Sequence, residues 1–472
     1  MGGHIVNKIE AKLLEGDDKD LILTAALNGC IKQEASFELT DKFRDDADKE
    51  KTSKRISGAL NHSLGMGHNA ALDLVGELVS VKNMTFVDVL AMNGITFGTP
   101  HLERSTRRSV MESVFIPDCI LENEELRRKV EEHIEEMFTL YNKFLELGAT
   151  MEDAMMILPI YYNTNCTYYI NGRAAYYIYQ MFTGNHSRFD GKHVAPFKRS
   201  QTMIDFGNMM FDLFAKKNPN LFKKGVEWGL LFDSLDFYPG SMEMFCEQNV
   251  MLENTIAKHA GDMNDKTALL ISDNEEAIGM SREQIKDAIE RRDEAGLANL
   301  RNLHYTFLAY VDLAVYKDYL RNRTIDFTIE PLYSAAERGE FYIPRTIKSK
   351  NLVNDYIDSC KKSLELYKYL VANGVEKEEA VGFIPSAVRV FSLASMNAFS
   401  LIHAACNRIC LRGRPNYIEF TQHMKGEMNK INSVILDYLV PRGLLYNLCP
   451  DKNIAEGGGK CMFCYPFANA KV

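Results

Sequence analysis

The stretches "LYNKFLELGATMEDA" at 140–154 and "LYKYLVANGVEKEEA" at 366–380 share one pattern. Three pairs of identical residues are separated by the same offset of 226 residues (367 − 141, 374 − 148 and 380 − 154). The pairs are Tyr141 and Tyr367, Gly148 and Gly374, and Ala154 and Ala380. A solenoid repeat spans only about 20–50 residues. The offset here is far longer and matches the length of a whole domain, so the pattern predicts two copies of one domain in tandem.

The repeat continues on both sides of these stretches. The matching segments are "FIP" at 115–117 with "YIP" at 342–344, "ILP" at 157–159 with "FIP" at 383–385, and Asn171 with Asn397. A Pro-Gly turn signal at 239–240 indicates that the join lies between 215 and 260. We therefore predict a first copy at 1–235 and a second copy at 236–472.

Composition limits the class of protein. A chain of 472 residues is too long for one hydrophobic core, which agrees with two domains. The net charge of −9 argues against nucleic acid as a partner, although it allows a local basic pocket. The sequence contains no run of 18 apolar residues, so it predicts no membrane helix. The segment "MGGHIVNKIEAKLLEGDDKD" at 1–20 lacks the apolar core of a signal peptide. We therefore expect a cytoplasmic protein with reduced cysteines and no membrane partner.

Helical periodicity dominates both copies. Apolar residues in 126–144 and in 353–371 recur at the spacing of one helix face. Gly148 and Gly374 follow these segments, where a helix C-cap is expected. Residues 76–86 and 303–313 show the β-branched and aromatic alternation of strands, within the broader helical pattern. Each copy is therefore predicted to be mixed α and β, with more helix than strand.

Two arginine-rich segments are candidates for phosphate binding. They are "LERSTRRSV" at 102–110 and "YLRNRTIDF" at 319–327. Guanidinium groups present fixed donors that match phosphate oxygens. The alternative interpretation is a set of surface arginines.

The order of these features resembles the flavin-dependent thymidylate synthases. That family's signature runs Arg-His-Arg, Asn-Glu-x-Ser-x-Arg-Tyr, aromatic-x-Pro, a long helix, Leu-Pro, Asn-x-Arg and a further Arg. In the first copy, "MGHNAALD" at 66–73, "ERSTRR" at 103–108, "FIP", Leu158-Pro159 and "NGR" at 171–173 are similar to parts of it. In the second copy, "YLRNRTIDF", "YIP", Ile384-Pro385, Asn397 and Arg408 are similar to others.

The two copies depart from the signature in different places. The first copy lacks Arg-x-Arg and has Phe182 where the second has Arg408. The second copy lacks Glu-x-Ser-x-Arg, has "TIEPLYS" at 328–334 instead, and has Asn322 in place of the family's His. Because sites of this family form between subunits, the resemblance implies that the copies complement one another. We expect Arg107 and Arg408 to face a common cleft, together with Arg321 or Arg323.

The resemblance implies a fold, a reaction and a set of site residues. The fold is α+β, with long helices packed on a mainly antiparallel sheet in each copy, and a homodimer that is a pseudo-tetramer of repeats. The reaction is one-carbon transfer from methylenetetrahydrofolate to carbon 5 of dUMP, or a close variant, with FAD as cofactor and NADPH as reductant. The residues implied in catalysis are Glu103, Ser105, Arg107 and Arg408, and those implied in cofactor binding are His68, Asn171, Arg173, Arg321, Arg323 and Asn397.

Other interpretations stay open at this point. The chain is alternatively a flavoprotein with another acceptor or carbon donor, or a non-catalytic nucleotide-binding scaffold, since fold does not imply function. His68 is equally compatible with a loop or helix-cap role. Asn171 and Asn397 are equally compatible with a structural role, because a buried Asn often fixes local backbone.

The C-terminus contains a separate candidate site. Cys449 precedes Cys461-x-x-Cys464, and two thiolates on one turn can reach a tetrahedral zinc or iron ion. Packed, reduced thiols are the alternative. "GGGK" at 457–460 lacks the glycine spacing and the Ser or Thr of a phosphate loop.

Overall fold

The computed structural model describes residues 45–65, 70–95, 99–105, 109–184, 199–219, 222, 242–263, 265–410 and 413–445, with short stretches at 4–5, 10–13, 24, 27–28, 39 and 42–43. The predicted boundary between the copies, at 235–236, lies outside these residues. Along the described part of the chain, no helix is long and apolar enough to cross a membrane.

The chain forms two compact units, and each contains a segment from the other copy. The first unit comprises Met1–Asn142, Leu158–Cys246 and Glu365–Ile384. The second unit comprises Lys143–Ile157, Glu247–Leu364 and Pro385–Val472. The two copies were predicted from the sequence, but this reciprocal exchange of segments was not.

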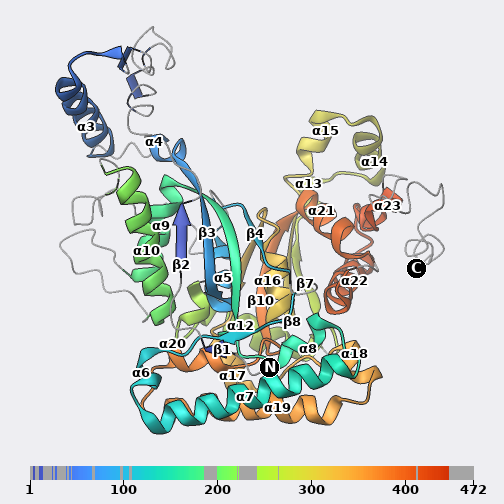
Figure 1. The fold of residues 1–472 in the computed structure, drawn as a ribbon. Helices are drawn as coiled ribbons and strands as arrows, with labels where there is room; N and C mark the ends of the chain where they lie inside the picture. The colour runs from blue at the N-terminus through green and yellow to red at the C-terminus, as the bar shows by residue number, and fades with distance from the viewer. Residues whose placement is uncertain are drawn as a thin grey trace. The chain divides into compact units, whose positions relative to one another are not determined.

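The first unit is built on a four-stranded antiparallel sheet in the order β2-β3-β6-β4 (Figure 1). Its strands are β2 (Glu10–Leu13), β3 (Gly76–Thr85), β6 (Asn163–Asn171) and β4 (His101–Glu103). The helices α9 (Gly172–Thr183) and α10 (Gln201–Lys217) pack together beside this sheet. The strand predicted at 76–86 is confirmed as β3.

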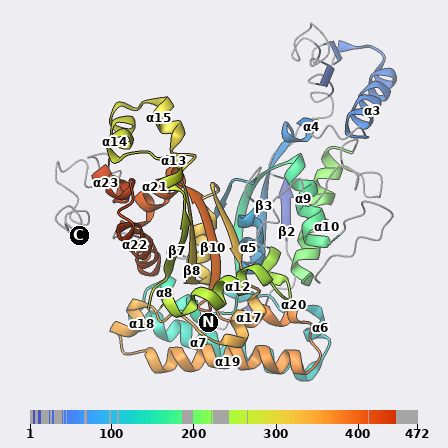
Figure 2. The ribbon, with the colours of Figure 1, turned by 180° about the vertical axis from the view of Figure 1, so that it is seen from behind.

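The second unit repeats this topology with a sheet in the order β7-β8-β10-β9 (Figure 2). Its strands are β7 (Ala268–Asp273), β8 (His304–Asp312), β10 (Arg389–Asn397) and β9 (Ile325–Ile329). All pairs in both sheets are antiparallel. In both sheets the fourth strand along the chain lies between the second and the third, so the tandem α+β fold is confirmed.

Corresponding strands lead into corresponding buried helices. Thr85 ends β3 and caps α5 (Phe86–Gly94) by accepting a hydrogen bond from the Asp88 amide. Asp312 ends β8 and caps α16 (Leu313–Leu320) through the Val315 amide. A polar N-cap directly after a strand satisfies helix amides that would otherwise be buried without partners.

The long amphipathic helices predicted from periodicity are α7 (Glu124–Glu146) and α19 (Val353–Ala372). Gly148 and Gly374 follow them with φ of 87° and 86°. This left-handed conformation favours glycine and ends a helix, which confirms the C-cap prediction. The charged helix α3 (Lys49–Gly65) exposes most of its first turns.

The remaining elements fill in the two units. In the first unit they are β1 (His4–Ile5), α4 (Ala70–Asp73), β5 (Ser113–Val114), α6 (Asp118–Leu121), η3 (Met242–Phe245), α20 (Lys377–Ala380) and η5 (Val381–Phe383). In the second unit they are α8 (Met151–Ala154), η1 (Met155–Ile157), α12 (Val250–His259), η4 (Ala260–Met263), α13 (Glu275–Ile278), α14 (Arg282–Arg291), α15 (Glu294–Asn299), α17 (Leu332–Arg338), α18 (Arg345–Ser349), α21 (Ala398–Arg408), α22 (Pro415–Lys430), η6 (Leu436–Tyr438) and α23 (Arg442–Leu445).

Candidate functional site

The Glu-x-Ser segment of the first unit is fixed by the neighbouring strand. Glu103 ends β4, where it pairs with Cys166 of β6. The next residue, Arg104, donates its amide to the Asn165 carbonyl at 2.9 Å and its guanidinium to the Val110 carbonyl. Ser105 is exposed one residue further on. Arg107 and His68, which were predicted from the sequence to lie in the same site, are outside the described residues.

The matched asparagines both act as helix N-caps. Asn171 accepts from the Ala174 amide at 2.8 Å at the start of α9, and Asn397 accepts from the Ser400 amide at 2.9 Å at the start of α21. Their backbone angles are also alike, at φ −82°, ψ 164° and φ −81°, ψ 166°. The cap uses one acceptor site of Oδ1 in each residue, and Nδ2 is the donor that each asparagine can offer to a ligand.

Replacing Asn397 by alanine is therefore expected to cost about 1 kcal/mol of stability, because the first turn of α21 loses its cap. Asn397→Asp keeps the acceptor oxygen and should retain most of this stability. Calorimetry of flavin or nucleotide binding to Asn397→Asp tests the separate expectation that Nδ2 contacts the cofactor. Unchanged binding in the aspartate variant would leave Asn397 with the cap alone.

Arg173, also predicted to bind the cofactor, forms a bidentate ion pair within the first unit. Its Nε and Nη2 lie 2.8 and 2.5 Å from the two carboxylate oxygens of Asp73. Both side chains are partly exposed, with relative areas of 26% and 43%. An anionic ligand would have to compete with Asp73 for this guanidinium.

The second unit gathers cationic side chains around one carboxylate, Asp318 of α16. Burial disfavours its charged form, but the positive charges around it outweigh this effect and hold the pKa of Asp318 below its usual value. The cations responsible are Lys317, Arg414, Arg321 and Arg408. Two of them, Arg321 and Arg408, were predicted from sequence, and the second unit brings them to a common carboxylate.

Arg408, the last residue of α21, is held by an aromatic ring. Its guanidinium carbon lies 4.8 Å from the centre of the Tyr417 ring, a distance at which the cation and the ring attract. Asn322 donates to the Tyr417 hydroxyl at 3.1 Å and to the Tyr319 carbonyl at 3.0 Å. Asn322 stands where the family signature has His, and here it positions the ring on which Arg408 lies.

One polar atom of this cluster lacks a hydrogen-bond partner in the described part of the chain. The Nε of Arg408 is buried and makes no hydrogen bond within the described residues. A buried donor without a partner is costly, and an anion or ordered water would satisfy it. The donor set therefore fits a phosphate or another anionic group of a nucleotide or flavin.

Several members of this cluster were not predicted from the sequence. Asp312 accepts from Asn416 at 2.7 Å, and Arg414 donates to the Glu152 carbonyl at 3.1 Å. Burial raises the pKa of Asp312, although the Arg414 charge opposes this. "GRPNY" at 413–417 predicts a helix start through Pro415. It contains no signal that its side chains meet the "LRNR" segment.

The second unit has a different structure where the first has Glu-x-Ser. Glu330 donates its amide to the Phe391 carbonyl at 3.0 Å, as Arg104 does to Asn165. Both matched pairs have the offset of the repeat (330 − 104 and 391 − 165). Ile329, fully buried, therefore occupies the position of Glu103. In the second copy, this position of the segment at 328–334 therefore contributes to the hydrophobic core.

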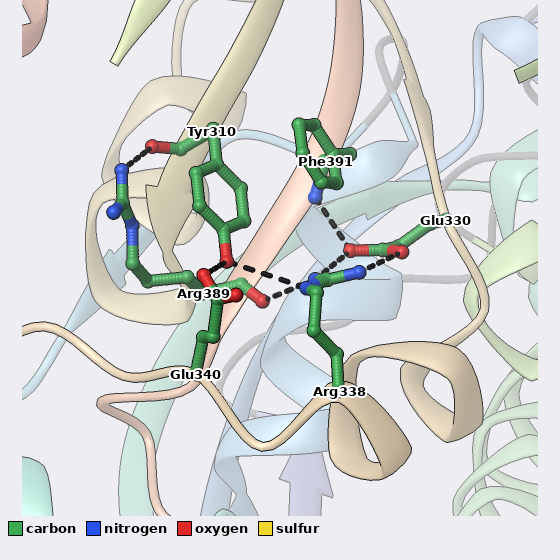
Figure 3. A network of polar contacts seen from close by, with 6 residues as sticks. All are labelled: Tyr310, Glu330, Arg338, Glu340, Arg389 and Phe391. Atoms are coloured by element: carbon green, nitrogen blue, oxygen red, sulfur yellow. Dashed lines mark hydrogen bonds and ion pairs between the residues drawn. The ribbon is translucent and has the colours of Figure 1, made fainter. Parts of the chain in front are cut away.

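Glu330 belongs to a polar network within the second unit (Figure 3). Arg338 donates to both Glu330 oxygens at 2.9 and 2.5 Å, and Phe391 donates its amide to the same carboxylate at 2.6 Å. Arg389 lies over the Tyr310 ring, 3.8 Å from its centre. The Tyr310 hydroxyl donates to Glu340. Arg338 and Arg389 thus meet acceptors and aromatic rings of the same unit, which makes this network a structural element.

The predicted metal ligands, Cys449, Cys461 and Cys464, lie outside the described residues. Within the described ranges, no group of three or more His, Cys, Asp or Glu residues is arranged to hold a metal ion.

Proteins of one known family are similar to this chain. The family model described as "Thymidylate synthase complementing protein" (Thy1) matches residues 12–196 and 255–432. The flavin-dependent thymidylate synthases of Pyrococcus furiosus and Pyrococcus abyssi are each 28% identical over 123 residues, which is 25% of this chain and 50% of theirs. The chain thus spans about half the length of the curated relatives it matches.

Solved structures of a UMP/dUMP methylase, PolB from Streptomyces cacaoi, are also similar. The structure bound with 5-Br dUMP has a TM-score of 0.38 at 18% identity, covering 46% of this chain and 94% of its own. The structure bound with 5-Br UMP has a TM-score of 0.38 at 15% identity, covering 49% and 99%.

Proposed function

Because the chain belongs to the family of thymidylate synthase complementing proteins, we propose that it is a flavoenzyme that transfers a one-carbon unit to carbon 5 of a pyrimidine nucleotide. The acceptor we propose is dUMP or a close analogue, with FAD as cofactor. We further propose that methylenetetrahydrofolate is the carbon donor and NADPH the reductant. We also propose that the protein is a cytoplasmic homodimer. The observation that carries it is the cationic cluster around Asp318, in which the buried Arg408 Nε has no hydrogen-bond partner among the residues that the structure describes.

In this proposal the protein binds and orients the nucleotide and the cofactor, because the flavin, when bound, supplies the hydride. Arg408 and Arg321 bind phosphate or uracil oxygens with charge-assisted hydrogen bonds. Tyr417 holds the Arg408 guanidinium in place, which lowers the entropy lost on binding. Glu103 and Ser105 are proposed to orient a nucleotide from the end of β4.

A direct experiment tests this function. Purified protein is expected to be yellow, with flavin absorbance at about 450 nm, and mass spectrometry of the released small molecules should identify FAD. The protein supplied with dUMP, methylenetetrahydrofolate and NADPH should then form dTMP. Bound flavin without dTMP formation would favour another acceptor, and a colourless protein that binds nucleotide would favour a scaffold.

Replacing Arg408 by alanine is expected to weaken dUMP binding by about 1.5–3 kcal/mol, the range for hydrogen bonds to charged groups. Calorimetry of the wild type and of Arg408→Ala measures the difference. Arg301→Ala, at an exposed arginine of the same unit, is the control and should bind like the wild type. Equal affinity in all three proteins would remove Arg408 from nucleotide recognition.

A further inference from the structure

In the second unit, the residue that leads into the edge strand β7 is held by a side chain of α22. The Thr267 amide donates a hydrogen bond to Nδ1 of His423 at 2.9 Å, and the Thr267 hydroxyl lies 2.8 Å from the same nitrogen. The Thr267 carbonyl accepts from the Tyr310 amide of β8 at 2.9 Å. Thr267 therefore joins the sheet on one side and α22 on the other.

A second side chain of α22 holds the preceding residue of the chain. The Glu427 carboxylate is 8% exposed, and its Oε1 lies 3.4 Å from Nζ of Lys266. Glu427 follows His423 by four residues, a spacing that places both side chains on one face of the helix. The two side chains thus hold two consecutive residues. We call these contacts, of His423 with Thr267 and of Glu427 with Lys266, the β7 clasp.

The β7 clasp lies between two parts of one hydrophobic cluster. Leu252 of α12 and Met263 of η4 precede the clasp, and Leu269 of β7 follows it. All three side chains are buried in a cluster that includes Leu308 and Phe391 of the sheet. The clasp therefore fixes the chain to α22 at the point where it passes from the covering helix α12 into the sheet.

The hydrogen bond from the Thr267 amide requires His423 to be neutral at Nδ1. A backbone amide can only donate, so Nδ1 accepts with its lone pair and the proton of the neutral ring lies on Nε2. In a protonated imidazole both nitrogens are donors, and Nδ1–H would face the amide N–H. The protonated ring can still donate to the Thr267 hydroxyl, but the amide of this buried residue would lose its acceptor. Because a buried amide without an acceptor is costly, protonation of His423 opposes the clasp.

The charged groups around His423 oppose one another. The two acids raise its pKa and the two bases lower it, and burial, which also lowers it, has the largest effect. The acids are Glu419 and Glu427 of α22, and the bases are Lys266, before β7, and Arg389 of β10. The pKa of His423 therefore lies below its usual value, which is the direction that the hydrogen bond from Thr267 requires.

We propose that the β7 clasp is acid-sensitive, closed when His423 is neutral and open when His423 is protonated. A histidine whose pKa is lowered on folding stabilises the fold fully above its unfolded pKa of about 6.5. This stabilisation is lost as the pH falls through the folded pKa, which for His423 lies below 6.5. The chain that enters β7 should therefore be held firmly at neutral pH and loosen in acid.

Native-state amide hydrogen exchange of the full chain at pH 8 and at pH 5 tests the clasp. After correction for intrinsic exchange, the opening constant of peptides within 265–273 should be at least about threefold higher at pH 5. Each pH unit below the unfolded pKa is worth up to about tenfold until the folded pKa is reached. Peptides from α17, in the same unit, are the internal control and should change much less. An unchanged opening constant within 265–273, or an equal rise in α17, would contradict the proposal.

Substitutions at His423 separate the clasp from general effects of acid. His423→Asn offers Oδ1 as an acceptor close to the position of Nδ1 and does not titrate, so 265–273 should stay protected at both pH values. His423→Ala removes the acceptor and should loosen the same peptides at both. His403→Asn, at an exposed histidine of α21, is the matched control and should keep the pH dependence of the wild type. A pH dependence that persists unchanged in His423→Asn would overturn the proposal, and the wild-type comparison with α17 still decides it if a variant fails to fold.

Discussion

Arg338→Ala is expected to destabilise the second unit by about 3–5 kcal/mol, because it leaves a buried carboxylate without its partner. The Glu330 side chain is 4% exposed, whereas that of Arg338 is 24% exposed. Removing the guanidinium also removes its contact with the Phe391 ring, whose centre lies 4.9 Å from the guanidinium carbon. Hydrogen exchange of peptides from β8 and β10 in increasing urea measures the loss within this unit.

Two controls distinguish the cost of leaving a charge buried from the cost of losing an ion pair. Arg173→Ala removes an equally bidentate pair from Asp73, whose side chain is 43% exposed, and should cost at most about 1 kcal/mol. The double variant Glu330→Gln/Arg338→Met removes both charges and should recover much of the stability that Arg338→Ala loses. Equal losses in Arg338→Ala and Arg173→Ala would contradict the role assigned to burial.

The sequence predicted those features that depend on spacing within one copy. The strands β3, β4 and β6 correspond to β8, β9 and β10 close to the offset of the repeat, whereas the first strands of the two sheets, β2 and β7, lie further apart (268 − 10). Gly148 and Gly374 mark the ends of α7 and α19 because a left-handed cap needs no distant partner. Asn171 and Asn397 were singled out by the same offset, and their local caps now account for their matching positions in the two copies.

Features that depend on distant partners were not predictable in this way. "RGRPNY" and "LRNR" lie far apart along the chain (positions 412–417 and 320–323), and no local pattern shows that both supply cations to Asp318. The network of Glu330 and Arg338 was equally hidden. Its carboxylate stands where the first copy has Arg104, and no local pattern shows that Arg338 pairs with it. The expected grouping of Arg107 with Arg408 stays a prediction, since Arg107 lies outside the described residues.

Gly382→Ala is expected to destabilise the first unit by about 3 kcal/mol, the upper end for overpacking a core. A Cβ at this position would lie 2.1–2.3 Å from three ring atoms of Tyr161. The ring cannot move aside, because it is fully buried and packs edge-on against Phe115 and Phe383 at 5.4 and 5.6 Å. Denaturant-dependent hydrogen exchange of peptides from β3 and β6 measures the cost.

Gly76→Ala is the matched control, because a Cβ there would also overlap a tyrosine, 2.0 Å from the Tyr169 hydroxyl oxygen. That ring is 42% exposed and can rotate into solvent, so the substitution should change stability by no more than about 0.5 kcal/mol. A Cβ at either glycine would therefore overlap a tyrosine ring, but the Tyr161 ring is confined and the Tyr169 ring can rotate. The strain at Gly382 acts on the backbone hydrogen bond that its carbonyl accepts from Tyr161, so Gly382→Ala should also lower the protection of segment 365–384 against hydrogen exchange. Stability losses of equal size at Gly76 and Gly382 would show that the overlap itself, and not the confinement of the Tyr161 ring, sets the cost.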